Sequence, residues 1–273
     1  MRTIGIILPG TANSFFSGLL DQLETELYAK GFNSLIRCFG NDTEREKQAY
    51  TALRAAGCEG IISISGLSEV PDDLAEADCP IVFADRVPMS KHEISWVSND
   101  DELAMKLASD YLIEKGCRDI LLLPGCLASQ QESERIRGYR TSLAEHGIEF
   151  DSRKVLSRSG KESSETETEQ LIRDYLGKGN HADAVITSSD RAAFGALTAL
   201  EQIGCYVPED IRLMCFDNSP YTAMAAPGIT ALDRRPDRIA YEAVGVMMCL
   251  LEKTETNTQR VIPVTLVERT STR

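Results

Sequence analysis

The sequence contains no apolar run that approaches the ~20 residues needed for a membrane-spanning helix. It also lacks an excess of basic residues, because 29 Lys and Arg stand against 42 Asp and Glu, which gives a formal net charge of −13. A surface this acidic repels phosphate backbones. We therefore expect no membrane partner and no direct binding of nucleic acid by these residues themselves.

Paired cysteines are missing as well. The chain has 8 cysteines, but they are scattered and never form C-x-x-C. This usage is typical of reduced, mostly buried thiols in a cytoplasmic protein. The first residues enter an apolar run directly, without the charged and apolar regions of a secretory leader. We expect a cytoplasmic protein that has no metal site and no cofactor.

Catalytic motifs are equally scarce. The sequence has only 3 histidines, and G-x-S-x-G, H-E-x-x-H and the P-loop pattern are all absent. Residues 177–182 match the dinucleotide pattern G-x-G-x-x-A, but they follow a helix-type segment and precede a strand-type one, which is the reverse of the required order. The sequence therefore predicts a binding protein with no catalytic residues, and an enzyme on a Rossmann-like scaffold is the weakest alternative.

What is present is a regular alternation of short apolar runs and longer amphipathic segments, which predicts an α/β fold with parallel sheets flanked by helices. The predicted strands are 4–8, 34–38, 60–64, 81–84, 94–97, 120–123, 155–157, 184–187 and 212–216. The predicted helices are 16–30, 43–56, 101–115, 133–146, 163–177, 191–203 and 238–253. This number of units is too large for one small doubly wound domain, so we expect two similar halves that meet near residue 116. Residues 260–267 predict two short strands broken by Pro263.

In parallel α/β sheets, ligands gather outside the carboxyl ends of the strands. The segments at those ends are 9–16, 85–86, 99–100, 125–135, 188–190 and 217–218. They combine aromatic rings, guanidinium groups, carboxylates and amides, a mixture that suits a hydroxyl-rich ligand.

Each of these residues also has a structural alternative. Asp100 and Asp190 precede predicted helices, and capping is the favoured role for both. Phe16 fits the core, and we expect one of Phe15 and Phe16 to be exposed. Asp85 and Arg86 fit a local ion pair. Asp217 follows a buried strand and needs partners, so we favour ligand contact there.

The same strand ends resemble the lactose-repressor (LacI) family over nearly the whole chain. Residues 3–9 and 13–16 read TIGIILP and NSFF, residues 81–86 read IVFADR, and residues 135–139 read RIRGY. The most specific stretch is 184–195, AVITSSDRAAFG, followed by GCYVPEDI at 204–211 and FDN at 216–218. The sequence differs from the family pattern at Ser14, Asn99, Asp100, Ser189 and Cys215.

The resemblance implies a periplasmic-binding-protein-like type I body, with two Rossmann-like lobes that the chain crosses three times. The N-terminal lobe would hold 1–116 and 235–260, and the C-terminal lobe 117–234 and 261–273. Family effector contacts fall on matching positions, with Phe15 and Phe16 as an apolar wall and Arg135 and Asp217 as the polar anchors. The full predicted effector-binding set is Phe15, Phe16, Asp85, Asn99, Ser129, Gln131, Arg135, Ile186, Ser189 and Asp217.

The resemblance also implies a function, namely sensing of a sugar-like effector by a homodimeric transcription regulator, a repressor in most of the family. Operator DNA would be reached only through a helix-turn-helix headpiece that these residues do not include. The alternative is a solute-binding protein that delivers sugar to a transporter, since it shares the fold.

Overall fold

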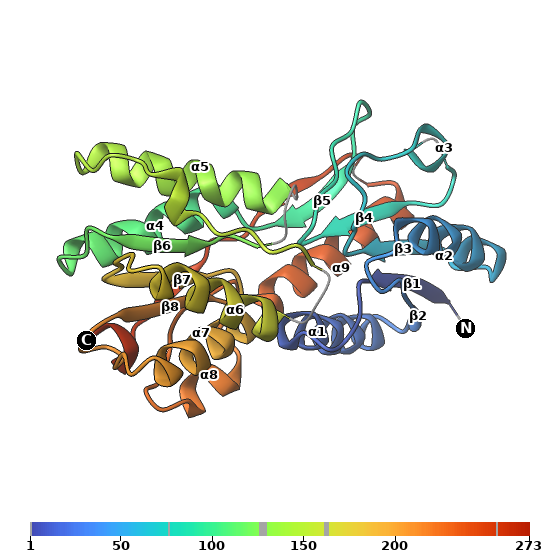
Figure 1. Ribbon diagram of the computed structural model, residues 1–273. Helices are drawn as coiled ribbons and strands as arrows, with labels where there is room; N and C mark the ends of the chain where they lie inside the picture. Colours follow the sequence, from blue (N-terminus) through green and yellow to red (C-terminus); the bar gives the residue numbers. More distant parts are fainter. Residues whose placement is uncertain (1, 76, 126–129, 161–163, 255) are drawn as a thin grey trace. The chain divides into compact units, whose positions relative to one another are not determined.

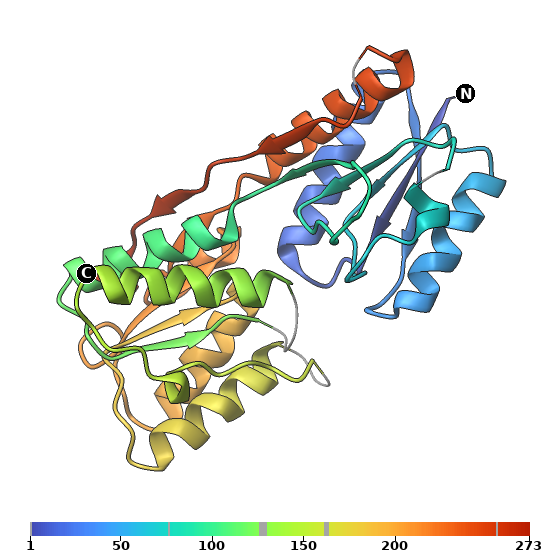
Figure 2. The ribbon, with the colours of Figure 1, turned by 90° about the horizontal axis from the view of Figure 1, so that it is seen from above.

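The computed structural model describes residues 2–75, 77–125, 130–160, 164–254 and 256–273. The chain divides into two compact units, each assembled from separate stretches of sequence (Figure 1, Figure 2). The first unit comprises Met1–Asn99 and Arg235–Pro263, and the second comprises Asp100–Arg234 and Val264–Arg273. No helix in the described part of the chain is long and apolar enough to cross a membrane.

The first unit is built on a parallel sheet whose strands follow the order β10-β5-β4-β3-β1-β2. The strands are β1 (Thr3–Leu8), β2 (Asn33–Cys38), β3 (Gly60–Ser63), β4 (Ile81–Ala84), β5 (Ser95–Ser98) and β10 (Gln259–Val261). The helices are α1 (Ser14–Ala29), α2 (Thr43–Ala55), α3 (Asp72–Ala75) and α9 (Pro236–Glu252). One hydrophobic core joins α1 and α9 to the sheet, and a second core joins α2 and α3 to it.

Local sequence explains how this unit begins. The side chain of Asn13 accepts hydrogen bonds from the backbone N–H groups of Phe15 and Phe16, so it caps α1. Leu19, Leu23 and Leu27 recur at helical spacing and are completely buried against the sheet. The cap and the apolar stripe together fix where α1 starts and which face it buries.

The second unit is built on a sheet whose strands follow the order β11-β9-β8-β7-β6. Its strands are β6 (Ile120–Leu123), β7 (Ala184–Thr187), β8 (Arg212–Phe216), β9 (Thr230–Asp233) and β11 (Thr265–Val267). Its helices are α4 (Asp101–Glu114), α5 (Gln130–Glu145), α6 (Ser164–Gly177), α7 (Asp190–Gln202) and α8 (Pro220–Met224), with short 3-10 turns at Ser152–Lys154 and Thr270–Thr272. The core between the sheet and α4 and α5 is distinct from the core between the sheet and α6 and α7.

The boundary between the units differs from the prediction of 116/117. Helix α4 belongs to the second unit, because Ala104, Ala108 and Leu112 are part of its core. The approach of α4 to α5 is close, since a Cβ at Gly138 would lie 2.0 Å from the Glu102 carbonyl oxygen. The later boundary also moves, from the predicted 260/261 to Pro263/Val264.

The observed strands differ from the predicted ones in three ways. Residues 155–157 form no strand, and only an isolated bridge joins Val155 to Leu122. Strand β9 was not predicted, although it pairs with β8. The two short strands around Pro263 are confirmed as β10 and β11, but β11 pairs antiparallel with β9 instead of extending a parallel order.

Candidate functional site

At the first unit's strand ends, Phe15 and Phe16 are both buried, with 6% and 8% of their surface exposed. Their rings meet edge to face with centroids 5.8 Å apart, and the Arg86 guanidinium lies 5.0 Å from the Phe16 ring centroid. The expectation that one of the two rings is exposed is therefore wrong, because both rings are part of the core beneath α1.

Asp85 and Asn99, the polar residues predicted on this unit, both take part in hydrogen bonds that involve backbone carbonyl groups of the same unit. Asp85 follows β4, is 4% exposed and has φ +66°, a left-handed conformation that turns the chain sharply after the strand. The Ser98 hydroxyl donates a 2.6 Å hydrogen bond to the Asp85 carbonyl oxygen. The Asn99 amide nitrogen donates to the Ile262 carbonyl oxygen at 2.8 Å. Asn99 thus joins the end of β5 to the segment that follows β10.

In the second unit, Arg135 extends from α5 to the ends of β6, β7 and β8, and is only 6% exposed. Its Nη1 donates to the Pro124 carbonyl oxygen at 3.0 Å and to the Ser188 carbonyl oxygen at 3.5 Å. Its Nη2 lies 3.4 Å from the Asp101 carboxylate, and the guanidinium is 4.2 Å from the Phe216 ring centroid. The carboxylate and the ring fix the plane of the guanidinium.

Asp217 has a different partner. It follows β8 with φ +70° and is 4% exposed, and its Oδ1 lies 3.3 Å from Arg234 Nη1. Arg234 is itself 6% exposed, so the two form a buried ion pair. The buried Asp217 carboxylate thus has a partner within the protein, and the predicted ligand contact at Asp217 stays a prediction. Sequence reasoning missed Arg234, which is the first residue after β9, and the run ITALD before two arginines was the available signal.

The remaining predicted residues play varied roles. Ser189 caps α7, because its hydroxyl accepts from the Ala192 N–H at 3.2 Å, whereas Asp190 is the first residue of the helix. Asp100 caps α4 as expected, accepting from the Leu103 N–H. Ile186 is completely buried in a core, which leaves it no surface for a ligand here. Gln131 is half-buried near the start of α5, and Ser129 lies outside the described residues.

Several buried polar atoms at these strand ends have no hydrogen-bond partner. They are Asp101 Oδ1, Arg135 Nε, Ser188 Oγ, Ser219 Oγ and, beside β6, Arg158 Nε. Buried polar groups in proteins are nearly always paired. These atoms are therefore available at the strand ends for hydrogen bonds to another molecule. Arg158, Ser188 and Ser219 were not in the predicted effector-binding set, although Ser188 directly follows strand β7.

Cys215 shows that this end of the sheet is not built for thiol chemistry. Burial raises the pKa of the Cys215 thiol well above its ordinary value, and the neighbouring Asp217 carboxylate raises it further. Its Sγ donates to the Asp217 carbonyl oxygen at 3.7 Å. A protonated, enclosed thiol is a poor nucleophile and a poor metal ligand. Cys126 lies outside the described residues. Among the described residues, no cluster of acidic, His or Cys side chains is suited to a metal.

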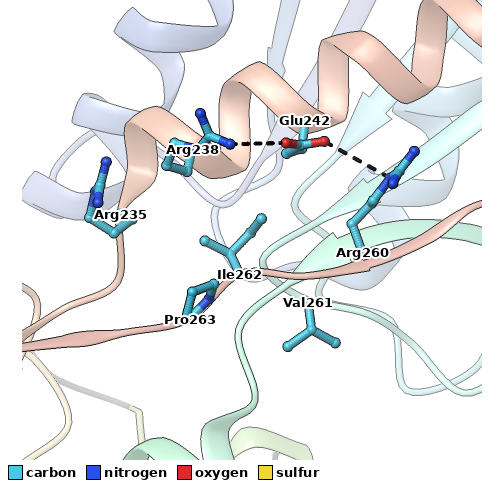
Figure 3. A pocket seen from close by; sticks show the side chains of 7 residues that line it. All are labelled: Arg235, Arg238, Glu242, Arg260, Val261, Ile262 and Pro263. Carbon is cyan, nitrogen blue, oxygen red and sulfur yellow. Dashed lines mark hydrogen bonds and ion pairs between the residues drawn. The ribbon is translucent and has the colours of Figure 1, made fainter.

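The first unit has a separate surface pocket of about 270 Å³ (Figure 3). It is lined by Arg235, Arg238, Glu242, Arg260, Val261, Ile262 and Pro263. Glu242 is shared between two arginines, because its carboxylate lies 3.2 Å from Arg238 and 3.9 Å from Arg260. Arg235 is paired with Asp237 at 2.8 Å. Around this pocket, three arginines are thus paired with two carboxylates, Glu242 and Asp237.

Comparison with known proteins places the chain in a family. Residues 109–272, more than half of the chain, match the family described as "Periplasmic binding protein-like domain". The HTH-type transcriptional repressor PurR of Vibrio vulnificus is 26% identical over 253 residues, which cover 90% of this chain and 74% of that protein.

Two solved structures share the fold over essentially the whole chain. The transcription regulator CcpA of Lactococcus lactis superposes with a TM-score of 0.86 at 26% identity, covering 100% of both chains. A periplasmic binding protein/LacI transcriptional regulator from Alkaliphilus metalliredigens, complexed with D-xylulofuranose, gives a TM-score of 0.88 at 24% identity and covers 99% of both. With its two α/β units and these relatives, the chain belongs to the periplasmic binding protein-like family, and the resemblance to the body of LacI-type regulators is confirmed.

Proposed function

We propose that this chain is the effector-sensing body of a LacI-type transcription regulator, acting as a repressor, and that it binds a small sugar-like molecule without transforming it. The observation that carries this proposal is the group of buried, unpaired polar atoms around Arg135 at the strand ends of the second unit. Such atoms bind a hydroxyl-rich ligand well, and their burial strengthens each hydrogen bond that the ligand makes. The relative from Alkaliphilus metalliredigens holds a sugar, which supports the same ligand class.

The regulator role is favoured over the transport role by the relatives. The Vibrio and Lactococcus proteins are a transcriptional repressor and a transcription regulator, respectively. Action on DNA would place this protein in the cytoplasm. Because the acidic body repels phosphate, operator contact would require a headpiece outside the 273 residues, and the match covers only 74% of the length of the Vibrio protein. We propose a homodimer, in which effector binding shifts the population between two states of the body.

Thermal denaturation in the presence of sugars tests this proposal. A ligand that binds only the folded state raises the melting temperature. We expect at least one sugar or sugar derivative in a panel of hexoses, pentoses, their acids and their phosphates to raise it, with no turnover of the compound detectable by chromatography. Consumption of the compound by the purified chain would contradict a sensing role, and a monomer by light scattering would contradict the homodimer.

A further inference from the structure

The surface pocket of the first unit is lined by more positive than negative side chains (Figure 3). Among the described residues that line it, Arg235, Arg238 and Arg260 are positive and Glu242 is negative. Between 40% and 50% of each arginine side chain is exposed, against 25% of the Glu242 side chain. The chain as a whole carries a net charge of −13. The pocket therefore presents accessible guanidinium groups, and its charge is opposite in sign to that of the whole chain.

The three arginines come from two elements of the unit. Arg235 and Arg238 are at the start of α9, and Arg260 is on β10. Glu242 lies between Arg238 and Arg260, because its carboxylate accepts a hydrogen bond from Arg238 at 3.2 Å and is 3.9 Å from Arg260 Nε (Figure 3). The second distance is too long for a hydrogen bond. One carboxylate is thus shared by two guanidinium groups, each of which carries several N–H donors.

The position of Arg235 and Arg238 is unfavourable for the helix to which they belong. Arg235 is the N-cap residue of α9, has φ +57°, and makes no capping hydrogen bond with its side chain. Arg238 follows in the first turn. The amino-terminal end of a helix carries a partial positive charge, which attracts anions and repels cations. Asp237 offsets part of this repulsion through its 2.8 Å ion pair with Arg235. The charges of the two arginines therefore do not stabilise the start of α9, but they do suit the binding of an anion.

We propose that this pocket binds a small anion with at least two acidic groups, either phosphates or carboxylates. The planar guanidinium group matches both kinds of group, because its N–H donors contact two oxygen atoms at once. Arg235 and Arg260 lie at opposite ends of the lining residues (Figure 3), so two acidic groups are needed to engage both. The volume of about 270 Å³ is at the small end of ligand pockets, which favours a compact anion. The pocket is distinct from the effector site, because its lining residues belong to the first unit and Arg135 to the second.

A bound anion would restrain both segments through which the chain leaves this unit. Arg235 is the first residue of the unit's second stretch, and Pro263 is its last. An anion held by Arg235 and Arg260 links the start of α9 to β10. The backbone N–H groups of Arg238 and Ile239 both donate to the Arg235 carbonyl oxygen at 3.0 Å. We expect the hydrogen exchange of these two N–H groups to slow when the anion binds, because the first turn of α9 then opens less often.

Calorimetric titration with pyrophosphate and with citrate, at constant ionic strength, tests the proposal. Pyrophosphate reports on a phosphate ligand and citrate on a carboxylate ligand, and acetate is the comparison with a single acidic group. We expect pyrophosphate or citrate to bind more tightly than acetate, and Arg238→Gln and Arg260→Gln each to weaken that binding about tenfold. Arg37→Gln is the matched control, because it removes one positive charge from an exposed position on β2. It should leave the affinity unchanged.

Glu242→Gln separates an anion site from a purely structural cluster by the sign of its effect. The Glu242 carboxylate competes with a bound anion for Arg238 and Arg260, so its removal should raise the affinity for pyrophosphate or citrate severalfold. A structural cluster would respond differently, because the variant would then lower the melting temperature and leave the affinity unchanged or reduced. That result would overturn the proposal.

The remaining outcomes distinguish this pocket from the effector site. If neither pyrophosphate nor citrate binds at millimolar concentration, or if Arg37→Gln weakens binding as much as Arg238→Gln does, the pocket is refuted. If binding survives in Arg238→Gln and Arg260→Gln but is lost in Arg135→Gln, the anion binds in the second unit, so the pocket is refuted while the sensing function stands. If no sugar raises the melting temperature but anion binding is lost in Arg260→Gln, the pocket stands and the sugar-sensing proposal fails.

Discussion

Two buried serines, one near a strand end in each unit, differ in their hydrogen bonds. Ser65 follows β3 in the first unit, donates to Glu46 Oε1 at 2.6 Å and accepts from the Leu67 N–H at 3.1 Å. Ser188 follows β7 in the second unit, and its hydroxyl has no partner. Every buried side-chain N or O atom recorded as unpaired in the described ranges lies in the second unit. In the described ranges the first unit pairs its buried side-chain polar atoms, whereas the second has several unpaired ones, which we assign to the proposed ligand.

The largest expected effect comes from the buried pair in the second unit. Asp217→Ala leaves Arg234 buried without its carboxylate, so we expect a loss of about 3–5 kcal/mol in the free energy of unfolding, measured by urea denaturation. Asp217→Asn keeps a residue that tolerates the left-handed backbone at this position and should lose less. An unchanged denaturation midpoint in Asp217→Ala would show that the pair contributes nothing to the fold.

A smaller loss is expected at Arg135. Arg135→Met leaves the Asp101 carboxylate unpaired, but Asp101 is in the first turn of α4, where the helix dipole favours a negative charge, so we expect a loss of about 2 kcal/mol. The double variant Arg135→Met with Asp101→Asn should recover most of it. Both variants should weaken effector binding in calorimetric titration. Additive losses in the double variant would contradict a coupled pair.

The two serines provide the most direct test of the comparison. Ser65→Ala should cost about 1 kcal/mol of unfolding free energy and leave ligand affinity unchanged, because it removes a satisfied hydrogen bond to Glu46. Ser188→Ala should leave stability unchanged or raise it, because no bond is lost, and should weaken effector binding. The two variants are matched in chemistry and burial, so equal effects from both would remove the distinction between the units.

The smallest effect is expected at the amino-terminal edge of the second sheet. A hydrogen bond from Lys154 lowers the pKa of Asp119 below its ordinary value. Because the pKa of Asp119 is lowered, its pair with Lys154 stabilises the fold fully at pH values above the ordinary pKa of a carboxyl group. This contribution is lost as the pH falls through the pKa of Asp119 in the folded state. We expect unfolding free energy to decline between about pH 5 and pH 3, and less steeply in Lys154→Met. Lys91→Met, a surface lysine of the first unit paired with Glu69, is the control and should decline as the wild type does.

Much of the fold was predictable because it is specified locally. The leucines of α1 repeat at helical spacing, and short apolar runs correctly marked most of the strands. Strand β9 was missed because its sequence, TALD, mixes polar and charged side chains with apolar ones and so is not a continuous apolar run. The unit boundary was misplaced because membership of α4 depends on its packing against α5, which no local pattern reports.

The candidate site was predictable in part for the same reason. A position at a strand end follows from the sequence, and it drew attention to Arg135 and Asp217, whose contact with an effector stays a prediction. The contacts that a side chain makes at a strand end do not follow from its position in the sequence. The carboxylate of Asp217 meets Arg234 from a strand that was not predicted, and Ile186 packs into the core although it lies one residue from the end of its strand.

Each unit is assembled from two separate stretches of the sequence, and this limits how the chain can be cut into fragments that fold. A fragment that stops at Asn99 would lack α9, whose Ile239, Val244 and Met247 complete the core beneath β1 and β4. A chain that ends before residue 259 would lose an edge strand from each sheet at once, β10 from one and β11 from the other. Neither unit can therefore be produced by a single truncation. A soluble half would require two stretches rejoined by a new linker, such as residues 2–99 connected to 235–263.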